Sequence, residues 1–139
     1  MSDPKYEIQR KVKEWVSYAD DDLIFAQHGL DITNGEPYRQ IAFHAQQCVE
    51  KYLKAYLVYR GIDFPYTHDI SALLKICAES ADWTDRLDDA KKLTPYATTL
   101  RYPGVDNVVT RDEVATAIEI AVRVRKFVRT ALIAEGLDI

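Results

Sequence analysis

The segment from Tyr38 to Tyr59 most constrains the fold, because it is a long stretch with neither Gly nor Pro and is rich in good helix formers. It can run about six turns of α-helix. Its apolar residues recur at steps of three and four: Ile41, Ala42, Ala45, Cys48, Val49, Tyr52, Leu53, Tyr56 and Tyr59. This apolar face is too wide for an ordinary surface helix, so we expect a central helix with neighbours on two sides.

The opposite side of the same segment is polar. We call it the polar stripe: Gln40, His44, Gln47, Lys51 and Lys54, flanked by Gln46 and Glu50. Two lysines at helical spacing can bind a phosphate through their charged ammonium groups. The side-chain amide of Gln can donate hydrogen bonds to a base or a ribose and accept them from it. In the alternative interpretation, Glu50 and Lys54 form an ordinary i,i+4 ion pair and the glutamines are solvated or bridge helices.

The other segments complete an all-α pattern. We expect helices over 5–28, 38–60, from Thr67 or Asp69 to about 79, and from Thr110 to about 134, with one or two short helices between 82 and 100 around Pro95. Thr110 with Glu113 fits a capping box. The breaks at 29–37, 62–68 and 101–107 carry the Gly, Pro, Asn and Asp residues of loops. The predicted fold is an up-and-down bundle of three long helices plus one or two short ones, in a single domain over 1–139.

Composition limits the function classes. The net charge of −4 gives no overall attraction for nucleic acid and leaves only local patches to bind phosphate. No run approaches about 18 apolar residues, so we expect no membrane span and a cytoplasmic protein.

Cys48 and Cys77 fall at apolar helix positions and predict buried thiols in a reducing compartment. We expect no metal and no cofactor, because the three histidines are scattered. The triplet Asp20 to Asp22 is expected to be a solvated face, since successive helical side chains diverge.

Four pieces of the chain, taken together, resemble the HEPN domain family (higher eukaryotes and prokaryotes nucleotide-binding domain). They are Trp15, Ala19, Asp22 and Leu23; then 42–47 with Glu50, Lys51 and 53–55; then 67–69; then 101–103. The resemblance implies a cytoplasmic helical domain, commonly a homodimer. It also implies a minimal nucleotidyltransferase as partner in a prokaryotic two-protein system of the toxin–antitoxin type, and binding of nucleotides or action on RNA.

Under this resemblance, the candidate nucleotide-binding residues come from three places. They are His44, Gln47, Glu50, Lys51 and Lys54 on the central segment, His68 in the following loop, and Arg101 with Tyr102 in the late loop. His68 stands near a helix start that favours anions, or else hydrogen-bonds its loop. Arg101 completes a positive pocket, or else pairs with Glu50 or Asp22. Tyr102 is expected to be exposed and is a candidate acceptor for modification by the partner.

Two other functions stay open. Family members that cleave RNA carry an Arg and a His a few residues apart near the start of a late helix. Arg39 and His44 have that spacing, but they lie on the central segment, and a five-residue step turns about 140°. A metal-independent endoribonuclease would use His44 as general base on a ribose 2′-OH and Arg39 on the phosphate, across a dimer. The other possibility is a structural oligomer without a ligand.

Overall fold

The computed structural model describes residues 3–103 and 108–139. Its elements are α1 (Pro4–Gly29), α2 (Tyr38–Arg60), α3 (Ile70–Cys77), the 3₁₀ segments η1 (Thr84–Ala97) and η2 (Thr99–Arg101), and α4 (Arg111–Ala134). No strand occurs among the described residues. The predicted all-helical bundle is confirmed.

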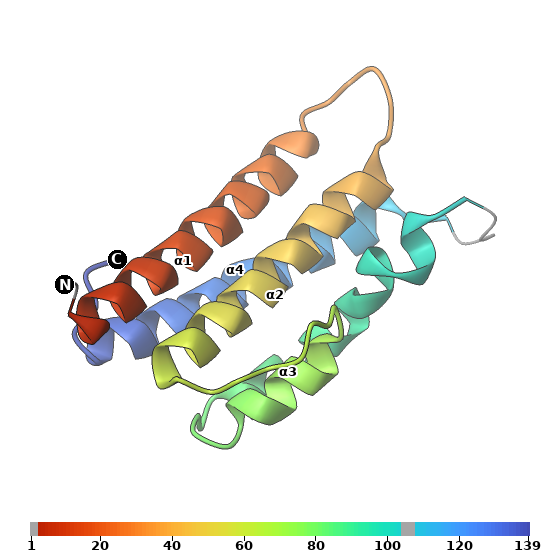
Figure 1. The fold of residues 1–139 in the computed structure, drawn as a ribbon. Coiled ribbons are helices and arrows are strands. Elements are labelled where there is room, and N and C mark those ends of the chain that lie inside the picture. Colours follow the sequence, from red (N-terminus) through yellow and green to blue (C-terminus); the bar gives the residue numbers. More distant parts are fainter. Residues whose placement is uncertain (1–2, 104–107) are drawn as a thin grey trace.

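α2 is the central helix, as predicted. It contacts α1, α3, η1, η2 and α4, which are all the other elements of the described chain. α1 and α2 form an antiparallel hairpin, α4 lies behind both, and α3 packs on the side of α2 away from α1 (Figure 1). The polar edge of α2 therefore lies between α1 and the 62–69 loop, and contacts both through Asp22 and His68.

The apolar face of α2 forms the core. Eight of its nine predicted apolar residues are buried, and only Tyr59 is half-buried. Both thiols are fully buried, which raises the pKa of Cys48 above its ordinary range and that of Cys77 to about 12. The cysteines are therefore protonated and unreactive in the folded protein.

Side chains at the helix ends explain the boundaries. The Asp3 carboxylate accepts from the amide of Lys5, and Asp69 caps α3 in the same way by accepting from Ser71. The hydroxyl of Thr110 accepts from the amide of Glu113, which confirms the predicted cap of α4. α2 ends at Gly61, whose φ of +67° is a left-handed conformation that glycine adopts without strain.

The aspartate triplet was predicted wrongly in part. Asp21 is exposed, but Asp20 and Asp22 both point towards neighbouring helices and form ion pairs. Asp20 accepts from the Tyr52 hydroxyl and, at 2.9 Å, from Nε of Arg125 on α4. Burial and the bond to Asp20 raise the pKa of Tyr52 above its ordinary value. Two of the three carboxylates therefore join α1 to α2 and α4.

Each helix of the described chain lacks an apolar stretch long enough to cross a bilayer.

Because Gly29 has no side chain, α1 and α2 can pack closely next to the loop that joins them. A Cβ at this position would lie 2.6 Å from Cγ1 of Ile41, closer than carbon atoms pack. We predict that Gly29→Ala lowers the free energy of unfolding by about 1–3 kcal/mol, measured by chemical denaturation. The combined variant Gly29→Ala, Ile41→Ala should cost at least about 0.5 kcal/mol less than the sum of the two single changes. Simple additivity would contradict the proposed clash.

Candidate functional site

The Asp22 carboxylate organises the outer part of the polar stripe. Its Oδ1 lies 2.8 Å from Nδ1 of His44 and its Oδ2 lies 2.6 Å from Nζ of Lys51. The Asp22 side chain is 12% exposed, whereas those of His44 and Lys51 are 27% and 23% exposed. An ionised carboxylate can only accept, so Nδ1 of His44 donates, and in the neutral imidazole Nε2 is then the acceptor. Asp22 thus fixes both side chains while they keep contact with solvent.

Two exposed aromatic rings of α1 flank this cluster. The ring of Phe25 lies 4.5 Å from that of His44, and the Tyr18 ring lies 5.9 Å from Nζ of Lys51. Phe25 is 59% exposed and Tyr18 is 57% exposed. We call this surface the α1–α2 face: Tyr18, Phe25, His44, Gln47 and Lys51. Flat, exposed rings next to fixed donors can stack on a base while the donors bind its sugar and phosphate.

The sequence analysis missed Tyr18 and Phe25. The signal that could have found them is their spacing, because two aromatic residues seven apart on one helix share a face. Both lie outside the apolar face of α1 that enters the core.

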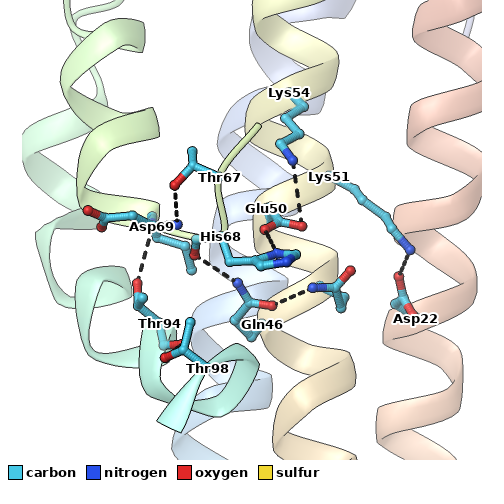
Figure 2. A network of polar contacts seen from close by, with 12 residues as sticks. Asp22, Gln46, Glu50, Lys51, Lys54, Thr67, His68, Asp69, Thr94 and Thr98 are labelled. Carbon is cyan, nitrogen blue, oxygen red and sulfur yellow. Dashed lines mark hydrogen bonds and ion pairs between the residues drawn. The ribbon is translucent and has the colours of Figure 1, made fainter. Parts of the chain in front are cut away.

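A second carboxylate, Glu50, organises the inner part of the polar stripe. Oε1 of Glu50 lies 2.6 Å from Nδ1 of His68, and Oε2 lies 3.8 Å from Nζ of Lys54 (Figure 2). Gln46 donates to the carbonyl of His68 at 3.2 Å, and Gln47 donates to Gln46 at 2.8 Å. Gln46 therefore bridges α2 to the loop before α3, whereas Gln47 bonds its neighbour on the same helix.

Lys54 is buried, and this corrects the expectation of an accessible stripe. Its side chain is only 7% exposed. Nζ lies 5.8 Å from the ring centroids of Trp15 and Phe64 and 5.7 Å from that of Tyr66. The Glu50–Lys54 ion pair does have the i,i+4 spacing of the alternative interpretation. It is buried under aromatic rings, and not on an ordinary solvated surface.

Of the remaining candidates, His68 belongs to the Glu50 cluster, and the structure records no contact of Arg39 with either cluster. Arg39 is exposed at the start of α2, and the structure records no contact between it and His44. His68 binds Glu50, while the neighbouring Asp69 caps α3. Tyr102 is 60% exposed, as expected. Arg101 ends η2, and its side chain lies outside the described part of the structure. No group of three or more His, Cys, Asp or Glu among residues 3–103 and 108–139 is placed to hold a metal.

The role of Asp22 can be tested by comparing two adjacent aspartates. We predict that Asp22→Asn lowers the free energy of unfolding by about 1.5–3 kcal/mol, because Lys51 and His44 both lose a charged hydrogen-bond partner. Asp21→Asn is the matched control, since Asp21 is exposed, and it should change stability by less than about 0.5 kcal/mol. Equal effects of the two changes in chemical denaturation would contradict the assignment.

Comparisons with known proteins place the chain in a family. The chain resembles the crystal structure of TT1696 from Thermus thermophilus with a TM-score of 0.72 and 28% sequence identity, covering 86% of this chain and 97% of that one. A search of curated proteins gave no significant match. The model of the HEPN domain matches residues 12–131, a range that contains both carboxylate clusters. The chain therefore belongs to the HEPN domain family.

Proposed function

We propose that this HEPN domain binds a nucleotide on the α1–α2 face. The observation that carries the proposal is the placement of two exposed rings, Tyr18 and Phe25, beside the fixed pair His44 and Lys51. Surfaces that bind single nucleotides or strands combine these two elements, because a ring stacks on any base and a cation meets the phosphate.

Each residue of the face has a distinct role in this proposal. Lys51 uses one of its three N–H donors on Asp22 and keeps the others for a phosphate. Phe25 and Tyr18 stack on the base. Gln47 lies between His44 and Lys51 along the helix and hydrogen-bonds the ribose or the base edge. Asp22 offsets the charge of Lys51, so we expect modest affinity that depends on stacking as much as on charge.

Family membership supports the wider setting that we propose. In this proposal the chain is one domain over 1–139, acts in the cytoplasm and forms a homodimer. Its partner is a minimal nucleotidyltransferase, and the two proteins form a prokaryotic system of the toxin–antitoxin type. Tyr102 is the proposed acceptor for a modification by that partner. Its exposure supports the proposal, and mass spectrometry after co-expression with the partner tests it.

The binding proposal predicts which lysine matters. Calorimetric titration of the full chain with AMP should give saturable binding, and Lys51→Ala should weaken it at least about tenfold, since a hydrogen bond to a charged group contributes about 1.5–3 kcal/mol. Phe25→Ala should weaken it about 5- to 150-fold through lost stacking. Lys75→Ala, on exposed α3 surface, is the control and should change nothing. Equal losses in the Lys51 and Lys75 variants would contradict the proposed site.

The second candidate function is metal-independent RNA cleavage, and the His44–Asp22 pair favours it. A carboxylate on Nδ1 orients the imidazole and leaves Nε2 free to take a proton. Nε2 would remove the proton of a ribose 2′-OH, and the 2′-oxygen would attack the phosphorus to give a 2′,3′-cyclic phosphate. The P–O5′ bond would break, and the departing 5′-oxygen would take up a proton from solvent water. Arg39, exposed at the start of α2, would contact the phosphate across a dimer, because the Arg39 and His44 side chains diverge within one chain.

Cleavage is tested with purified full-length chain, labelled RNA and EDTA. If the protein is a ribonuclease, His44→Ala should lower the rate about 10²- to 10⁴-fold, the usual contribution of a general base. RNA that stays intact with the unmodified protein would eliminate this function. If AMP binding were also absent, the third possibility, a structural oligomer without ligand, would be the one that remains.

A further inference from the structure

Residues 62–68, which we call the strap, lie between α2 and α3 in the chain and contact Glu50 and Lys54 of the polar stripe; the contact between His68 and Glu50 is seen in Figure 2. We propose that the strap covers a second phosphate-binding subsite, built on Lys54 and adjacent to Lys51, and that a ligand with two phosphates opens it. This inference rests on the proposed nucleotide site and specifies its ligand class and its regulation.

The strap covers Lys54, which would otherwise be a second exposed lysine beside Lys51 of the α1–α2 face. Lys54 lies one helical step beyond Lys51, and side chains three residues apart on a helix are neighbours, about 5–6 Å apart at Cβ. That separation suits two linked phosphates. Two of the three rings around Nζ of Lys54, those of Phe64 and Tyr66, belong to the strap. Removing the strap would leave Lys54 beside Trp15 and open to solvent.

Side-chain contacts, and not a backbone hydrogen-bond ladder, hold the strap closed. The His68 ring binds Glu50 and the His68 carbonyl accepts from Gln46, while Ile62 and Phe64 pack against the core, with the Phe64 ring 6.5 Å from that of Trp15. Residues 63–68 take part in no backbone–backbone hydrogen bond recorded within the described chain, and Tyr66 is 90% exposed. A segment without backbone hydrogen bonds opens at a lower free-energy cost than a helix of the core. The strap therefore belongs to the part of the molecule that a ligand can displace.

The present contacts of Lys54 are weaker than the hydrogen bonds that a phosphate would offer it. Its ion pair with Glu50 spans 3.8 Å, which is longer than a hydrogen bond, and the rings offer it attraction without an acceptor. A phosphate oxygen would offer short, charge-assisted hydrogen bonds. Because the phosphate meets Lys54 only in the open arrangement, binding favours that arrangement.

The test compares AMP with ADP, which differ by one phosphate. Calorimetry on the full chain should show that His68→Ala raises the affinity for ADP at least about threefold more than that for AMP, since the strap then costs less to open. Adding Lys54→Met should abolish this preference. Phe64→Leu loosens the strap without touching Glu50 and should act in the same direction as His68→Ala. Asp63→Asn, an exposed change within the strap, is the control and should leave both affinities unchanged.

A second readout needs no nucleotide. Acetylation of Lys54 by an amine-reactive ester, followed by mass spectrometry, should be slow in the unmodified protein and at least about fivefold faster in His68→Ala, with Lys75 as the internal reference. Pyrophosphate alone should slow the acetylation of Lys54 in His68→Ala.

The outcomes separate the two proposals. An unchanged ratio of ADP to AMP affinity in both strap variants would overturn the second subsite, even with normal AMP binding at Lys51. Absence of AMP binding would overturn the proposed nucleotide site. In that case protection of Lys54 by pyrophosphate would still support the phosphate subsite, and lack of protection would overturn it.

Discussion

The structure depends on two carboxylates that are each shared between a histidine and a lysine. Asp22 holds His44 and Lys51, and Glu50 holds His68 and Lys54. The side chains of Asp22 and Glu50 are only 12% and 4% exposed, and an unpaired charge at such depth would be costly. Pairing therefore fixes where these elements lie: Asp22 sets the position of α1 against α2, and Glu50 seats the loop before α3.

The register of the α1–α2 hairpin follows a regular pattern. Along α1, the rings of Trp15, Tyr18 and Phe25 meet Lys54, Lys51 and His44 in turn, which follow one another in the reverse direction along α2. Equal steps in opposite directions are what antiparallel packing of two helices produces. The consequence is a row of three contacts between a ring and a basic side chain, of which the Phe25 and Tyr18 contacts face solvent and the Trp15 contact is covered by residues 62–68. The surface between α1 and α2 therefore has an accessible part at Phe25 and Tyr18 and a covered part at Trp15.

Helical periodicity was enough to predict the fold, because the apolar residues of α2 and the cap at Thr110 are local signals. The incorrect predictions concern side chains whose burial and partners depend on a second element of the fold. Asp20 and Asp22 were expected in solvent, since a single sequence does not show that arginines of α4 and a lysine of α2 stand opposite them. Lys54 was expected on an open stripe, because nothing in its own helix reveals that Phe64 and Tyr66 cover it. The spacing of His44 and Lys51 predicted that they share one face of α2, and the structure shows both on Asp22. Tyr18 and Phe25 were not predicted beside them, because exposed rings look like ordinary surface positions in a sequence.

The central claim is that this member of the HEPN family has its ligand site on the α1–α2 face. Heteronuclear NMR of the full chain during titration with AMP tests this claim most directly, because it maps the contact residue by residue. We predict saturable shift changes centred on Tyr18, Phe25, His44, Gln47 and Lys51, with little change at α3. Shift changes centred elsewhere, for example on Arg60, Trp83 and Phe127 at the opposite end of α2, would contradict it.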